Sequence, residues 1–136
     1  MDKETDFTLR PEISKEIDIF LEDFYPKSQN AGDEMSRARL SPSQLRGLEN
    51  LIVSTTRFSE IKNYIKNQTG KDKKNQWIQV ASLLLGQLDS IEDKARKISG
   101  DDVSLLLKIK MTLAQGWARQ VITHYLYANT KLRIEQ

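Results

Sequence analysis

The chain has no cysteine, and this absence removes several classes of site at once. Disulfides and zinc sites built on thiolates are excluded, and an intracellular location fits. Histidine is nearly absent as well, since His124 is the single one. Helical zinc and di-iron sites need a Glu-x-x-His pattern or a second histidine, and neither occurs. The sequence therefore predicts no metal site and no cofactor.

Long apolar runs are lacking too. No window reaches the 18 or more consecutive apolar residues typical of a membrane-spanning helix. The first six residues, Met1–Asp6, have no apolar stretch of the kind found in a signal peptide. We therefore expect a cytoplasmic protein with no membrane partner.

Residues for catalysis are also scarce. His124 falls at the edge of an apolar helical stripe, where packing or hydrogen bonding explains a lone histidine. The segment Thr69–Lys71 has neither the upstream glycine nor the Ser/Thr of a phosphate-binding loop. Neighbouring carboxylates such as Asp101 and Asp102 diverge by about 100° on a helix, so they do not share a proton easily. We predict that the protein is not an enzyme.

The chain does have a strong division of charge. Residues 1–36 contain 4 Lys/Arg and 10 Asp/Glu, whereas residues 37–75 contain 9 Lys/Arg and 3 Asp/Glu. The two segments have net charges of −6 and +6 (4 − 10 and 9 − 3), although the whole chain has only +2. A dense basic segment can bind a polyanion even when the total charge is small.

Helical periodicity dominates the chain, starting with an acidic first helix. Its apolar residues follow one another at spacings of four, three, one and three, which form one stripe on a helix: Ile13, Ile17, Phe20, Leu21 and Phe24. Tyr25-Pro26 is predicted to end this helix, because the residue before proline avoids the helical region. Residues 26–39 are then a loop or linker.

A second helix begins at Ser41, with Pro42 at its first position and Gln44 placed to complete a capping box. Its apolar residues extend to Ile65 with a repeat shorter than that of a straight helix, so we expect a bend or break at residues 54–56. A basic, exposed turn is predicted at 67–75.

A third helix starts near Trp77 and ends at Ser99-Gly100, where glycine suits the position after a helix. Asp101 is predicted to cap a fourth helix with an inward stripe from Val103 to Tyr125. That helix is apolar on two sides, which is typical of a central helix or of one half-exposed to a partner. The predicted fold is an all-α bundle of four to five helices in one domain, 1–136, with an acidic helix and linker at 1–36 and a helical core at 40–130.

Several basic and amide residues are spaced along these helices in the manner of a nucleic-acid-binding rod. Arg46 and Arg57 are three helical turns apart, and Lys108 and Arg119 belong to a polar stripe of the fourth helix. A solvated helix face is the alternative reading of the same residues. The candidate RNA-binding residues are Gln44, Arg46, Arg57, Lys62, Lys66, Lys108 and Arg119.

The segment Leu40–Arg46, Leu-Ser-Pro-Ser-Gln-Leu-Arg, is followed by an apolar helix and a basic turn. In this it resembles the small helical subunit of type III CRISPR effector complexes. Residues 113–120 are compatible with the same family, and the likeness covers the layout of roughly residues 40–127. The acidic segment before Glu34 departs from the family core.

The resemblance implies a non-catalytic all-α subunit of a ribonucleoprotein that acts in antiviral defence. Several copies stack as a filament beside other effector subunits, and their basic residues line the duplex of guide RNA and target RNA. Gln44 and Arg46 match the motif, while Arg57, Lys62 and Lys66 follow by location only. Ser43 has a structural place at the helix start.

Two other functions stay open on the sequence. The acidic first helix could serve a helical protein–protein adaptor that binds a basic partner. The second helix could serve a small DNA-binding regulator, although it lacks a recognition pattern rich in Arg, Asn and Gln.

Overall fold

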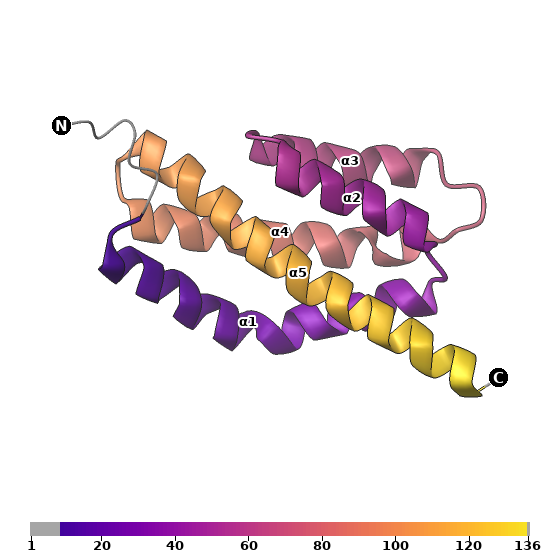
Figure 1. Ribbon diagram of the computed structural model, residues 1–136. Helices are drawn as coiled ribbons and strands as arrows, with labels where there is room; N and C mark the ends of the chain where they lie inside the picture. The colour runs from indigo at the N-terminus through magenta and orange to yellow at the C-terminus, as the bar shows by residue number, and fades with distance from the viewer. Residues whose placement is uncertain (1–8, 136) are drawn as a thin grey trace.

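The computed structural model describes residues 9–135, with side chains described up to Leu132. The described residues form five α-helices and no strand, which confirms the predicted all-α bundle (Figure 1). The helices are α1 (Pro11–Arg37), α2 (Pro42–Ser54), α3 (Phe58–Gly70), α4 (Trp77–Ser99) and α5 (Val103–Glu135). The segment Met1–Asp6, on which the signal-peptide expectation rests, lies outside the described residues.

Helix α5 runs diagonally across the bundle and contacts each of the other four helices (Figure 1). Trp117 and Tyr125 on this helix are completely buried. Its contacts with four helices explain part of its two-sided apolar surface, since Ile109 is buried, whereas Tyr127 on the same side is 61% exposed. The prediction that the inward stripe of this helix starts at Val103 is wrong. Val103 and Leu107 face solvent, whereas Ile109 is buried. At that end α5 is apolar around more of its circumference than its neighbours cover.

Helix α1 corrects the prediction that Pro26 ends a helix and starts a linker. The helix continues through Pro26 to Arg37, and Figure 1 shows it bent near its middle. Pro26 is exposed, so its missing N–H and its ring disturb only the solvent side of the helix. Beyond the bend, Ala31 and Met35 are completely buried. Residues 26–37 are therefore part of the core.

Two contacts fix α1 against the centre of the bundle. A Cβ atom on Gly32 would lie 2.8 Å from the backbone nitrogen of Tyr125, so only glycine permits this approach of α1 to α5. The buried amide of Gln87 on α4 donates to the Lys27 carbonyl at 2.9 Å and accepts from the Trp117 indole at 2.8 Å. One side chain thus joins three helices.

The predicted start and break of the second helix are confirmed. Ser41 Oγ accepts from the Gln44 amide at 3.2 Å, and Gln44 Oε1 accepts from the Ser41 amide at 2.8 Å, so the capping box is complete. After Ser54 the backbone is extended at Thr55, and α3 begins at Phe58. The hydroxyl of Ser54 donates to the Asn50 carbonyl, a local competitor of helical hydrogen bonds.

The other boundaries differ from the prediction by a few residues. Helix α3 continues to Gly70, so the predicted basic turn at 67–75 is shorter and follows Lys71. Helix α4 ends at Ser99 as expected, and Gly100 has a φ of 62°. Helix α5 is capped by Asp102 instead of Asp101, because the Leu105 amide donates to its carboxylate at 3.0 Å.

Candidate nucleic-acid interface

The seven predicted RNA-binding residues do not form one surface. The break after α2 places Arg46 and Arg57 on different elements, so the three-turn spacing between them does not hold. Arg57 is the residue before α3, where its guanidinium pairs with Glu60. The Thr55 hydroxyl and Arg57 together lower the pKa of that carboxyl. Arg57 is therefore an exposed but already paired cation.

Lys62 belongs to a group of ion pairs that we call the Glu92 network: Glu92, Lys62, Lys110, Asp89 and Arg96. The Glu92 carboxylate forms ion pairs with Lys62 Nζ at 3.3 Å and with Lys110 Nζ at 3.2 Å, and Lys62 also pairs with Asp89. The side chains of Lys62 and Lys110 are only 22% and 16% exposed. These ion pairs connect α3, α4 and α5, so Lys62 stabilises the contact between helices.

The pKa values in the Glu92 network follow from this pairing. Desolvation favours the neutral form of each group, yet the opposite charges outweigh it. The pKa of the Glu92 carboxyl is therefore lowered, chiefly by hydrogen bonds from Lys110 and Lys62. The pKa of Lys62 is raised by Asp89 and Glu92. Both groups are held in their charged forms.

The remaining candidates are dispersed. Arg46 and Lys66 are exposed on α2 and α3, while Lys108 is half-buried on α5. Arg119 is exposed on α5 and lies in a small hollow between α2 and α5, where Glu49 is its neighbour. Among the seven, Gln44 alone lines the hollow described next.

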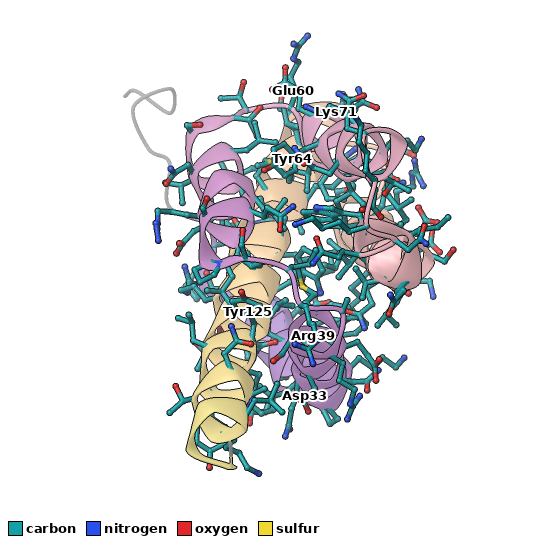
Figure 2. The ribbon with its side chains drawn as sticks, turned by 90° about the vertical axis from the view of Figure 1, so that its right-hand side faces the viewer. Asp33, Arg39, Glu60, Tyr64, Lys71 and Tyr125 are labelled. Carbon is teal, nitrogen blue, oxygen red and sulfur yellow. The ribbon has the colours of Figure 1, made fainter. Side chains whose placement is uncertain are left out.

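Four cations lie around one end of the bundle, where α2 and α4 begin and α1 and α3 end. A hollow of about 520 Å³ there, which we call the basic hollow, adjoins two connections between helices. Figure 2 shows Arg39 and Lys71 at this end of the molecule. None of its four cations takes part in an ion pair with the described residues. Its lining residues are Arg39, Ser41, Gln44, Gln68, Lys71, Asp72, Lys73, Lys74, Gln76 and Trp77.

Arg39 is held in a conformation that usually belongs to glycine. Its φ is 65°, and it occupies the position after the end of α1, where the Leu40 amide donates to the Met35 carbonyl at 3.3 Å. Two anchors fix this connection: Gln76 Nε2 donates to the Arg39 carbonyl at 2.8 Å, and Tyr125 Oη donates to the Leu40 carbonyl at 2.5 Å. The backbone that presents Arg39 is thus fixed from both sides.

Asp72, the one acidic residue of the basic hollow, is directed at the start of α4. Its carboxylate accepts from the amides of Ile78 at 3.1 Å and of Lys74 at 3.3 Å. Desolvation favours the neutral acid, but these backbone donors outweigh it and lower the pKa of Asp72. The carboxylate therefore caps the helix and forms no ion pair with the neighbouring lysines.

Trp77 closes the inner side of the basic hollow. The ring is buried, and its Nε1 has no hydrogen-bond partner among the described residues. Tyr64 stands edge-on to it with 6.2 Å between ring centroids, and the Tyr64 hydroxyl donates to the Gln44 carbonyl at 3.3 Å. A rigid aromatic wall thus supports the first turn of α2.

Arg39, Lys71, Lys73 and Lys74 line the basic hollow but are not among the seven predicted RNA-binding residues, although the three lysines belong to the predicted basic turn. The density of lysine in the turn was a usable signal, but helical periodicity favoured residues on rods over residues in connections. Arg39 gave no sequence signal, because its place in the hollow depends on α1 continuing through Pro26.

No protein-family model, curated protein or solved structure matches this chain. Between residues 9 and 135, no helix has an apolar stretch that would cross a bilayer. Within the part of the chain that the structure describes, no three His, Asp or Glu side chains are grouped in a way that would hold a metal ion.

Proposed function

We propose that this chain is a non-catalytic, RNA-binding small subunit of a cytoplasmic type III CRISPR effector ribonucleoprotein. In this proposal it meets ribose-phosphate strands of guide and target RNA with the basic hollow. The resemblance at Leu40–Arg46 supports the family. Two residues of that motif, Ser41 and Gln44, line the hollow, so the motif and the unpaired cations coincide in space.

The observation that carries the proposal is the grouping of four unpaired cations around one hollow. Lys71, Lys73 and Lys74 are exposed, as is Arg39. Lysine and arginine neutralise phosphates, and the amides that line the same hollow hydrogen-bond to phosphate and ribose oxygens. Such contacts give affinity that depends strongly on salt and weakly on base sequence.

The test compares two charge reversals of equal size. The variant Lys71→Glu/Lys73→Glu changes the hollow, while Lys15→Glu/Lys97→Glu makes the same change in net charge at exposed sites elsewhere. Fluorescence anisotropy with a labelled RNA at several salt concentrations measures Kd. The hollow variant should weaken binding at least about tenfold and reduce the salt slope by about 2. Equal losses in both variants would contradict the proposal.

The same proposal includes partners: other effector subunits and further copies of this chain, stacked side by side. Purification of the tagged protein from its native host, with sequencing of bound RNA and mass spectrometry of bound proteins, tests it directly. Recovery of the protein without RNA and without any effector subunit would count against membership in such a complex.

A second candidate is the adaptor, favoured by the exposed acidic face of α1. Five carboxylates there make no ion pair with described residues: Glu12, Glu16, Asp18, Glu22 and Asp23. Deleting residues 1–36 would not test this, because α1 is part of the core. Neutralising Glu16, Asp18 and Glu22 to their amides leaves the core intact. An adaptor should lose its partner, whereas RNA binding should be kept or strengthened.

A competition experiment with bulk DNA distinguishes a DNA-binding regulator from the RNA-binding subunit and from the adaptor. A regulator should prefer one duplex DNA sequence over bulk DNA, and the RNA-binding subunit should not.

A further inference from the structure

A second hollow adjoins the basic hollow. This apolar groove, of about 650 Å³, lies between the last turns of α5 and the connection from α1 to α2. Arg39 and Ser41 line both hollows, so the two are adjacent. Its apolar surface comes from Leu126, Leu132 and Pro42, and polar residues such as Arg37 and Asn129 line the rest of the groove.

The groove exposes apolar side chains that the bundle does not use. Leu126 is 51% exposed and Leu132 is 44% exposed, although both are large apolar residues on α5. Neither lies in the packed core of the bundle. A ligand that covers them must itself present apolar surface, and one that also reaches the basic hollow must be anionic.

We infer that the basic hollow and the apolar groove together bind single-stranded RNA, with phosphates at the lysines and unstacked bases against Leu126 and Leu132. This inference rests on the proposed function and differs from what the resemblance implies, since it places a single strand on this surface instead of the duplex of guide RNA and target RNA. A single strand offers both features, because its base faces are accessible and its backbone is charged. A duplex hides its base faces in the stack, so it would leave the apolar groove uncovered.

Arg39 stands at the junction of the two hollows. The anchors from Gln76 and Tyr125 hold its backbone, and its guanidinium has no carboxylate partner among the described residues. Arginine binds a phosphate with two donors and also lies flat against a base. Both contacts suit the point where a strand passes from the charged hollow to the apolar groove.

The experiment uses the full chain and two probes: a short labelled RNA strand of mixed sequence, and the same strand annealed to its complement. The wild-type protein should bind the single strand about fivefold more tightly than the duplex. The variant Leu126→Ser/Leu132→Ser should lose this preference and keep its duplex affinity and salt slope. The matched control is Val103→Ser/Leu107→Ser, which removes exposed apolar residues from the opposite end of α5.

The outcomes separate this inference from the function on which it rests. Equal wild-type affinity for strand and duplex, or an unchanged preference in the Leu126/Leu132 variant, overturns the single-strand inference. If Lys71→Glu/Lys73→Glu still binds RNA more weakly than wild type in that case, the basic hollow remains the proposed RNA-binding surface. If that variant binds both probes like wild type, the proposed function falls as well.

Discussion

The lysines of this molecule include two groups that differ in their surroundings, those of the Glu92 network and those of the basic hollow. In the Glu92 network, Lys62 and Lys110 are half-buried, paired with carboxylates and placed over the Phe58 ring, with ring-centroid distances of 5.9 and 5.3 Å. In the basic hollow, the lysines are exposed and make no ion pair with the described residues. The first arrangement stabilises the contact between helices, and the second leaves charge available for a ligand. The number of cations in a segment therefore says little until their partners are known.

Removal of the Glu92 charge should produce the largest change in stability. Glu92→Gln leaves Lys110 without its carboxylate partner and removes one of the two partners of Lys62. We expect the free energy of unfolding to fall by about 2 kcal/mol, between the values for exposed and buried pairs. Urea denaturation measures this loss, and RNA affinity should not change.

The control for that variant is Asp93→Asn, one residue along α4. Asp93 is exposed and has a single ion pair, with Arg96 at 3.7 Å, so its loss should cost less than about 0.5 kcal/mol. Similar losses in the two variants would mean that the Glu92 network is no stronger than a surface pair.

The contribution of Glu92 should also depend on pH. Its pKa is lower in the folded protein than its ordinary value of 4.5, so its stabilising effect is fully present above that value. As the pH falls through the folded pKa, the carboxylate is protonated and the effect is lost. The stability difference between wild type and Glu92→Gln should therefore shrink toward zero in acid. A difference that stays constant with pH would show that lost packing, not lost charge, destabilises the variant.

Arg39→Gly should move stability and binding in opposite directions. Glycine adopts the positive φ of this position without strain, so we expect a gain of about 0.5 kcal/mol together with weaker RNA binding. Thermal unfolding and anisotropy measure the two effects. Asn75→Gly is the control, because Asn75 also has a positive φ, of 57°, and no charge. Its RNA affinity should be unchanged, and equal loss in both variants would remove Arg39 from the interface.

The smallest effect should come from Lys71→Ala/Lys73→Ala. These exposed lysines make no ion pair with described residues, so the free energy of unfolding should change by less than about 0.5 kcal/mol. Lys62→Ala should cost clearly more. If Lys71→Ala/Lys73→Ala were as destabilised as Lys62→Ala, these lysines would stabilise the fold as the Glu92 network does, and the two groups of lysines would not differ in function.

The fold could be read from the sequence where the signals are local. The Ser41 capping box, the break after Ser54 and the end of α4 at Gly100 each depend on a few neighbouring residues. The course of α1 could not be read in this way. Proline disfavours a helix locally, and only the burial of Ala31 and Met35 against the bundle outweighs that preference.

The candidate site was harder to predict for the same reason. Helical spacing placed Arg46 and Arg57 on one face, but a break of three residues separated them. Lys62 is not available to a ligand because it is paired with Asp89 and Glu92 on another helix. Local periodicity in the sequence does not predict such contacts between distant segments. The lysines after α3 line a hollow because the connection at Arg39 lies beside them.

The two carbonyl anchors on that connection have a kinetic consequence. Gln76 and Tyr125 fix the chain at Arg39 and Leu40, so in the proposed complex with RNA this connection does not have to rearrange during the encounter. For the proposed RNA ligand, long-range attraction to the exposed cations should then govern the association rate constant, which should fall steeply with ionic strength. The dissociation rate would instead depend on the close contacts made after docking. Capture and residence time could thus be tuned separately in this small protein.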